Sequence, residues 1–484
     1  MKLKDNKIYR CIIIPICIAM CFLGRFIPTN GVLTSDAMGV IFIFLGSLIL
    51  WLTIGIDWPS LVCIFALAFL DNLSFGSVLQ SSFGNSTFIF LLFTFVCTYA
   101  LSKTSLIKKI AISFINSKLA KKSGFLFIAL FLTSVLLLGL FISPSVLFVV
   151  ILPILKEILN IANIEKGHKV AKVMLLGLGF TVSISSGMTP IAHVFPILAM
   201  SAAKIEVSSL VYMGIAIPTG LVIFLLMLLM FFIYLRKDAD VIKGIDVSSL
   251  KKDLKKIDAK DIVTLVIFIV VILLWILPSI FKGVSIEFYN AINQYGTAMP
   301  PLLGTILLCV IRIKNEPIIK IDDALKNGIP WGSLLMCAAT LVLGSALTND
   351  AIGIKSTLSN AIGSSIGSLP IIVLLIIFVC WAAIQTNLSS NMVTATLVAT
   401  VASSVLSSVI NISIAEFNTI ICLIGMMASF AFATPPSMPH IAIVAGDENC
   451  STKDVLIFGS ILMVISIICT CLIGYPLGLG LFNL

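Results

Sequence analysis

Four short polar segments interrupt long apolar stretches of the sequence, at residues 143–145, 185–190, 386–391 and 433–436. Three of them contain Pro or Gly, which break the hydrogen-bond ladder of a helix, and all four carry hydroxyl or amide side chains. Freed carbonyl groups suit a hard monovalent cation, and helix N-termini with Ser, Thr or Asn donors suit carboxylate or sulfate oxygens. The breaks therefore predict a site that an anion and a cation share. A single break could instead be a plain kink or a polar contact between helices.

The composition excludes a water-soluble globular protein. Of the 484 residues 59% are hydrophobic and only 11% are charged, and the mean hydropathy is +1.17. We therefore expect an all-α polytopic membrane protein. The net charge of +9 does not indicate nucleic acid as a partner, because the cations lie in loops between apolar segments. The sequence has no His–Cys metal cluster, nucleophile triad or phosphate-binding Gly loop, so we expect no enzyme.

The distribution of Lys and Arg predicts the orientation in the lipid bilayer. Of 31 such residues, 27 fall in segments that alternating spans place on one side, namely the N-terminus, residues 103–122, 156–172, 236–260 and 312–326, and Lys453. Positively charged loops stay in the cytoplasm. We therefore expect a plasma-membrane protein with a cytoplasmic N-terminus, about eleven transmembrane helices and an external C-terminus.

Two long parts of the chain repeat one order of elements. In each, an apolar helix is followed by an amphipathic segment (106–119, then 352–366), a hairpin and a broken helix. An odd number of crossings separates equivalent elements, so the copies have opposite orientation, as in inverted-repeat secondary transporters. We expect an N-terminal tail and first transmembrane helix (1–36), a first repeat (37–235, hairpin about 124–161), a basic cytoplasmic linker (236–261) and a second repeat (262–484, hairpin about 369–408).

The polar run at residues 385–391 marks the tip of the second hairpin. The apolar arms on either side, 369–384 and 392–406, are each shorter than the roughly 20 residues that a helix needs to cross a bilayer core. Non-helical backbone at membrane depth persists only inside protein or beside a watery cavity. We therefore predict that both hairpins are re-entrant and that their polar tips form part of the site.

At these breaks the chain resembles the divalent anion/sodium symporter (DASS) family, a carboxylate- and sulfate-transporting group of the ion-transporter superfamily. The family's Ala-Thr-Pro-Pro run is intact at residues 433–436, and Ser390 and Asn391 match its second hairpin tip, with Met392 where Thr is usual. At the first tip Pro144 replaces Asn, and two serines stand where the family has glycines at residues 183–186. The order of elements agrees from about residue 37 to the C-terminus.

This resemblance implies an elevator-type transporter that forms a homodimer. It also implies Na⁺ as the coupling ion and a small anion, a di- or tricarboxylate or sulfate, as the substrate. The sodium-binding residues that it implies are Ser143, Gly187, Ser390, Asn391 and Ala433, and the substrate-binding residues are Ser145, Thr189, Asn391, Thr434 and Pro435.

Two of the three histidines follow the Thr-Pro breaks. His193 comes four residues after Thr189, and His440 comes six residues after Thr434. An ionisable residue inside a span is costly and suggests function, and His titrates near neutral pH. Each is a candidate for a proton or anion contact, unless it caps a neighbouring helix. Coupling to H⁺ or anion exchange on the same fold is thus the alternative to sodium symport, and a channel fits less well because paired hairpins do not line a continuous pore.

Overall fold

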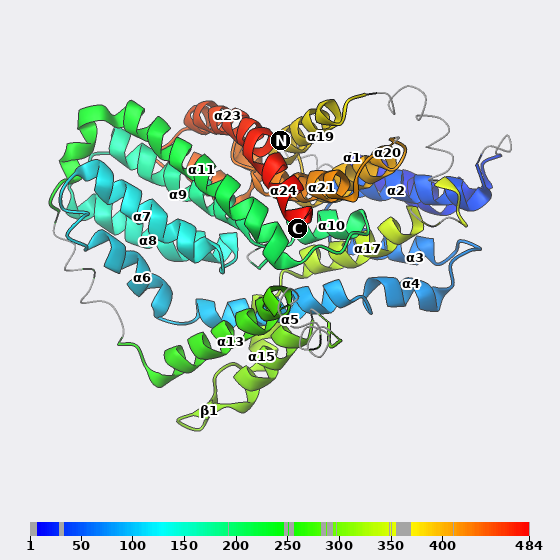
Figure 1. The fold of residues 1–484 in the computed structure, drawn as a ribbon, viewed down its shortest axis with the longest axis horizontal. Coiled ribbons are helices and arrows are strands. Elements are labelled where there is room, and N and C mark those ends of the chain that lie inside the picture. The colour runs from blue at the N-terminus through cyan, green and yellow to red at the C-terminus, as the bar shows by residue number, and fades with distance from the viewer. Residues whose placement is uncertain are drawn as a thin grey trace.

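The structure is a computed structural model of the chain, and it describes residues 7–28, 33–191, 193–245, 250, 256–281, 287, 294–296, 298–347, 349, 351–354, 369–409 and 411–483. Figure 1 shows that the chain is built almost wholly of helices. Helices suit a bilayer because each satisfies its own backbone hydrogen bonds. The prediction of a mostly helical membrane protein is therefore confirmed.

The first half of the chain contains the helices that lead up to the basic linker. In order, they are α1 (Lys7–Leu23), η2 (Gly24–Phe26), α2 (Ser35–Thr53), α3 (Trp58–Leu67), α4 (Phe75–Ser82), α5 (Ser86–Ser102), α6 (Leu106–Ile115), α7 (Gly124–Gly139), α8 (Pro144–Ile161), α9 (Lys169–Met188), α10 (Phe195–Ala202), α11 (Ser209–Leu235) and η3 (Arg236–Ile242).

The second half begins after the linker and adds one short β-hairpin to the helices. In order, its elements are α13 (Ala259–Phe281), α15 (Met299–Val310), β1 (Arg312–Ile313), β2 (Glu316–Pro317), α16 (Ile321–Asp323), η4 (Ala324–Gly328), α17 (Trp331–Leu347), α19 (Ile371–Leu388), α20 (Asn391–Leu406), α21 (Ile414–Ser429), η5 (Pro435–Ser437), α22 (Pro439–Ala445), α23 (Thr452–Cys469), η6 (Thr470–Gly474) and α24 (Tyr475–Phe482).

Six helices of the described residues are long and apolar enough to cross a membrane: Phe75–Ser102, Pro144–Ile161, Lys169–Met188, Ser209–Ile242, Ile371–Leu388 and Thr452–Phe482. A seventh results if Ile321–Gly328 and Trp331–Leu347, which meet at 78°, form one span. Further apolar helices of 10–17 residues accompany them. The expected number of about eleven spans stays a prediction.

The arms of the two hairpins have the expected lengths. α7 and α8 have 16 and 18 residues, and α19 and α20 have 18 and 16. At 1.5 Å per residue, α7 and α20 are about 24 Å long, less than the roughly 30 Å of a bilayer core, whereas α8 and α19, at about 27 Å, are at the lower limit for a span. The first amphipathic segment forms α6, whereas residues 355–366 of the second lie outside the described residues, as do residues 246–249 and 251–255 of the linker.

α9 and α21 form the centre of the fold. α9 is almost wholly buried, with 94% of its most apolar 18-residue stretch inside the protein, and it packs against α7, α8, α11 and α21. α21 packs in turn against α10, α19, α20 and α24. On the other side of the molecule, α5, α13 and α15 pack on one another, and Figure 1 shows them below the rest together with β1. The two central helices are those that precede the second and fourth breaks, so the fold brings these breaks together.

Ion pairs connect two loops that the charge count assigns to the cytoplasm. The loop between α8 and α9 and the loop between α22 and α23 lie side by side, and the backbone N–H of Gly167 donates to the side-chain oxygen of Asn449 at 3.0 Å. The ion pairs at this place are Lys156–Asp447 (3.0 Å), Lys166–Glu448 (2.7 Å) and Lys172–Asp454 (2.8 Å). These segments therefore lie at the same end of the fold, and its location on the cytoplasmic side stays a prediction.

Candidate functional site

The second hairpin turns more tightly than its polar run suggests. α19 continues through Leu388, and only Ser389 and Ser390 lie between it and α20. The N–H and the hydroxyl of Ser389 both donate to the carbonyl of Gln385, at 2.8 and 3.0 Å. These bonds hold the last helical turn, so most of the polar residues at the tip are helical.

Asn387, in the last turn of α19, ties the hairpin tip to the break after α21. Its side-chain oxygen accepts hydrogen bonds from the N–H groups of Phe432 (2.8 Å) and Ala433 (2.6 Å). Its side-chain nitrogen donates to the carbonyls of Phe430 (3.2 Å) and Ala383 (2.8 Å). Residues 430–434 have no helical ladder, and buried backbone groups outside a ladder need such partners. One buried amide thus supports the open backbone of the fourth break.

Other polar side chains also bond the second hairpin tip to the break after α21. Thr434 donates its hydroxyl proton to the carbonyl of Asn387, and Thr386 donates to the carbonyl of Ala428 at 2.6 Å. The amide of Asn391, in the orientation that suits its neighbours, donates to the carbonyls of Thr386 (3.0 Å) and Ser437 (3.1 Å). A hydroxyl has one proton, so in this conformation Thr434 offers a substrate only its lone pairs.

The first hairpin has a similar contact. Thr189, the residue after α9, donates its hydroxyl to the carbonyl of Leu140 at 2.6 Å. Ser143 is the N-cap residue of α8, and Pro144 is the first residue of that helix. The N–H at this position has no partner within a helix, so its absence in proline costs nothing. Pro144 therefore begins a helix instead of breaking one. Ser145, a predicted substrate ligand, lies exposed on the first turn.

The contacts of the two hairpins occupy equivalent positions. Leu140 lies three residues before Ser143, the N-cap of α8, and Asn387 lies three residues before Ser390, the N-cap of α20. Each of these carbonyls accepts a hydrogen bond from the threonine of a Thr-Pro pair in the next break. We call these two hydrogen bonds the tip latches.

α9 does not break where the sequence suggests. The hydroxyls of Ser185 and Ser186 donate to carbonyls one turn earlier in the helix, those of Val182 (3.0 Å) and Ser183 (2.8 Å). Because these serines are satisfied inside the helix, α9 continues to Met188. The prediction of a break from residue 185 is therefore wrong, and the break begins at Thr189.

Gly187 allows the ends of α9 and α21 to approach. A Cβ atom at this position would lie 2.8 Å from the ring of Phe430 and 3.0 Å from the Cβ of Ser429, which is too close for any side chain. The carbonyl of Gly187, a predicted sodium ligand, accepts a hydrogen bond from the Tyr212 hydroxyl at 2.5 Å. Through Gly187 and the tip latches, all four breaks belong to one cluster.

The two histidines lie in different surroundings. His440, on α22, is buried, and its Nε2 atom lies 2.9 Å from the hydroxyl oxygen of Ser183 on α9. His193 is half-buried, and its Nδ1 atom accepts from the N–H of Val194 at 3.0 Å. A ring nitrogen that accepts carries no proton, so neutral His193 holds its proton on Nε2. His440 is therefore the one that connects the two predicted repeats.

A cavity beside the second break is nearly closed. It lies between Ile191 and residues of α5, α13 and α15, among them Phe90, Phe268 and Trp275, and its volume is about 20 Å³. Sites for small molecules usually measure about 300–1,000 Å³. The lining of this cavity is almost wholly apolar and its volume is small, so the cavity is not itself a site for a carboxylate.

The structure thus gathers most of the predicted site residues at two neighbouring places. The first is the first hairpin tip and the end of α9, with Ser143, Gly187 and Thr189. Asn391, Ala433, Thr434 and Pro435 lie at the second hairpin tip and the break that contacts it, with Ser390 at the start of α20. Sequence reasoning missed Asn387. The signal was present, because an amide in a polar run can satisfy both N–H and C=O groups of an open backbone.

Polar helix breaks that are bonded in matched pairs inside a bundle of apolar helices are typical of secondary membrane transporters. The model of the citrate transporter family (CitMHS) matches residues 47–420, and the chain belongs to this family. Its members are transporters and not enzymes, as predicted. The family belongs to the ion-transporter superfamily alongside the DASS family, so the predicted relationship is confirmed. No curated protein matches the chain.

Proposed function

We propose that this protein imports a small carboxylate, citrate or a similar di- or tricarboxylate, across the plasma membrane together with Na⁺. The observation that carries the proposal is the pair of tip latches, Thr189 to Leu140 and Thr434 to Asn387. Each joins a hairpin to a helix break, and the accepting carbonyl lies three residues before the N-cap of the second hairpin helix in both cases. This is the arrangement expected of a site between two inverted repeats. The family supports a carboxylate as the substrate.

The charge of the substrate requires compensation at this site. The four breaks contain no Lys or Arg. An unpaired buried anion is costly, so positive charge must come from elsewhere. The N-termini of α8 and α20 lie at the two tips and supply roughly +0.5 charge each, and bound Na⁺ supplies the remainder.

We propose separate sets of ligands for sodium and for the substrate. Sodium is held by Ser143 and Gly187 at the first tip, and by Ser390, Asn391 and Ala433 at the second. The substrate contacts Ser145, Thr189, Asn391, Thr434 and Pro435. An ionised carboxylate only accepts hydrogen bonds, so Thr434 would have to release the carbonyl of Asn387 in order to donate to the substrate.

Transport also requires a conformational change that exposes the site to each side of the membrane in turn. The helices that carry the hairpins would move against α5, α13 and α15, from which the small apolar cavity beside Ile191 separates them. We propose an elevator-type movement in a homodimer, with the N-terminus in the cytoplasm and the C-terminus outside.

Proton coupling is the second candidate, and His440 favours it. This buried histidine contacts Ser183 on α9, beside the cluster of breaks, where a change in protonation would alter a contact between the predicted repeats. An exchanger on the same fold would need no coupling ion.

Uptake into proteoliposomes distinguishes these cases. Labelled citrate, succinate and sulfate would each be offered with an inward gradient of Na⁺, of H⁺, or of neither. We expect carboxylate uptake that Na⁺ stimulates. Stimulation by H⁺ alone would favour the second candidate, and preference for sulfate would overturn the proposed substrate class.

A further inference from the structure

His440 lies where three parts of the cluster of breaks meet. It is the second residue of α22, the helix that follows the fourth break, and only 1% of it is exposed. The centre of its ring lies 5.7 Å from that of Phe148 on α8, the second helix of the first hairpin. Its Nε2 atom lies 2.9 Å from the hydroxyl oxygen of Ser183 on α9. One side chain thus contacts the first hairpin and α9 and belongs to the helix after the fourth break.

The contact continues from Ser183 to the open backbone of the fourth break. The hydroxyl of Ser183 donates to the carbonyl of Ala431 at 3.3 Å, and both residues are wholly buried. Asn387 of the second hairpin bonds backbone groups of the residues on either side, Phe430 and Phe432. A buried carbonyl outside a helical ladder needs a partner, and Ser183 supplies the one for Ala431.

The position of each proton in this chain follows from what its group can do. The ring of His440 is neutral, because no ion pair of the described residues includes it and an unpaired buried charge is costly. A neutral ring has one N–H group, and Nδ1 is buried without a hydrogen-bond partner among the described residues. Because buried N–H groups are left unpaired more rarely than acceptors, the proton belongs on Nε2. The carbonyl of Ala431 only accepts, so Ser183 donates its single proton there.

We propose that His440 is a positioning residue for the sodium site at the second hairpin tip, and this inference rests on the proposed function. By donating from Nε2 to the oxygen of Ser183, the ring directs the hydroxyl proton toward Ala431. The hydroxyl then holds the backbone two residues before Ala433, a proposed sodium ligand. His440 keeps one proton throughout in this role, which distinguishes it from a proton carrier.

Two substitutions of His440 separate donation from packing. The amide nitrogen of a glutamine reaches about as far along the side chain as Nε2, and that of an asparagine about as far as Nδ1. His440→Gln can therefore still donate to Ser183, whereas His440→Asn cannot, and Ser183→Ala removes the hydroxyl itself. We expect the Na⁺ concentration for half-maximal citrate uptake to rise about tenfold in the Asn and Ala variants and to change little in the Gln variant.

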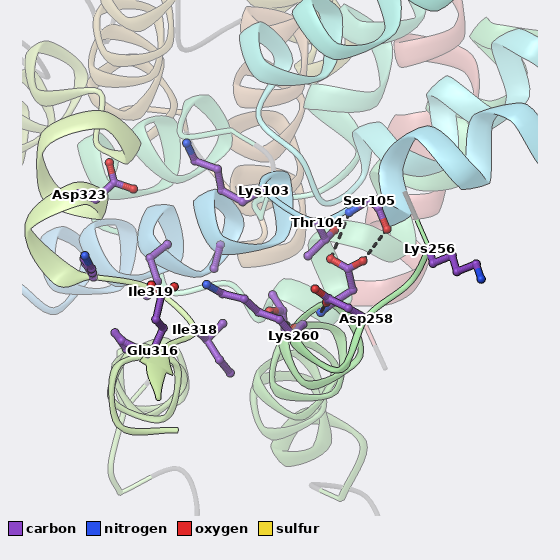
Figure 2. A pocket seen from close by; sticks show the side chains of 15 residues that line it. Lys103, Thr104, Ser105, Lys256, Asp258, Lys260, Glu316, Ile318, Ile319 and Asp323 are labelled. Carbon is purple, nitrogen blue, oxygen red and sulfur yellow. Dashed lines mark hydrogen bonds between the residues drawn. The ribbon is translucent and has the colours of Figure 1, made fainter. Parts of the chain in front are cut away.

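Ser105→Ala is the matched control, because the hydroxyl of Ser105 also bonds a residue of another helix. It donates to a carboxylate oxygen of Asp261 on α13 at 2.5 Å, beside a cavity of about 410 Å³ between α5 and α13. Figure 2 shows this bond of Ser105 as a dashed line. The control loses a buried contact of the same kind in another part of the molecule. It should lower the melting temperature and leave the Na⁺ concentration for half-maximal uptake unchanged.

The double variant Ser183→Ala/His440→Asn tests whether the histidine acts through the serine. If it does, the double variant should behave like Ser183→Ala alone, since the second substitution removes a donor that has already lost its partner. Addition of the two losses would overturn the proposal. Equal losses in His440→Gln and His440→Asn would also overturn it, because they would show that the packing of the ring matters and donation from Nε2 does not.

NMR of the ring nitrogens, in full-length protein with isotope-labelled histidine in lipid, tests the same inference without transport. The resonances of His440 are those that His440→Gln lacks. At neutral pH we expect a proton on Nε2 and none on Nδ1, and a proton on Nδ1 would overturn the proposal. A parent protein without sodium-stimulated uptake would overturn the proposed function instead, and it would leave this spectrum unaffected.

Discussion

The side-chain oxygen of Asn387 lies 2.6 Å from the backbone nitrogen of Ala433, so one amide of the second hairpin supports the open backbone of the fourth break. The same side chain also bonds Phe432 and Phe430. The break therefore keeps its shape through a residue that belongs to another helix. Any movement of the hairpin must carry the break with it, or break these bonds.

The first prediction follows from this contact. Asn387→Ala leaves the N–H groups of Phe432 and Ala433 and the carbonyl of Phe430 without their partner. A buried polar group that loses its partner costs about 1–3 kcal/mol, so we expect a clearly lower melting temperature and little uptake. Asn160→Ala, at an exposed position of α8, is the control and should melt like the parent. An unchanged melting temperature in Asn387→Ala would contradict the proposed support.

The second prediction concerns the tip latch of Thr434. Thr434→Val keeps the shape of the side chain and removes the hydroxyl, which frees the carbonyl of Asn387. We expect substrate affinity to fall by about 1–3 kcal/mol, measured from uptake at fixed Na⁺ and pH. Thr434→Ser retains the hydroxyl and should largely preserve affinity. Equal affinity in the Val variant and the parent would move the substrate site away from this break.

The third prediction concerns the approach of α9 and α21. Gly187→Ala places a Cβ atom 2.8 Å from Phe430 and 3.0 Å from Ser429, so the two helix ends must separate. Overpacking of this kind costs about 1–3 kcal/mol, and we expect reduced uptake and a lower melting temperature. Gly480→Ala is the matched control, because nothing lies within 4 Å of its added Cβ. If both variants behave alike, the close approach is not required.

The fourth prediction concerns orientation. Single cysteines placed at residues 103–122 and 236–260 should react with impermeant reagents only from the cytoplasmic side. A cysteine placed at residues 352–366 should react from outside. Labelling of both amphipathic segments, 106–119 and 352–366, from one side would contradict the inverted repeat.

The sequence predicted the class of fold well, because hydropathy and the lengths of apolar segments decide which helices form in lipid. The expectation that the breaks and the hairpin tips lie together agrees with the structure, in which Thr189 bonds Leu140 and Thr434 bonds Asn387. It failed where polar residues are satisfied locally. Ser185 and Ser186 bond carbonyls within α9 and leave the helix intact, and Pro144 begins α8. Neither outcome is visible in composition, because it depends on the partners that the fold supplies.

The polar run marked Asn387 as a candidate, but its partners in the fourth break could not be predicted, for a related reason. Its partners lie 43–46 residues away in the sequence, and only the packing of α19 against α21 brings them within reach. The number of membrane spans is also beyond the sequence, since several apolar helices are too short to cross alone.

The most direct test of cation-coupled carboxylate transport is the accumulation of labelled citrate in proteoliposomes with an inward Na⁺ gradient, for the parent and for Asn391→Ala. Asn391 is buried at the start of α20 and bonds Thr386 and Ser437. We predict that the parent accumulates citrate above the external concentration and that a sodium ionophore abolishes this. The variant should show no stimulation by Na⁺. Equal stimulation in both proteins, or no citrate accumulation by the parent under any cation gradient, would contradict the account.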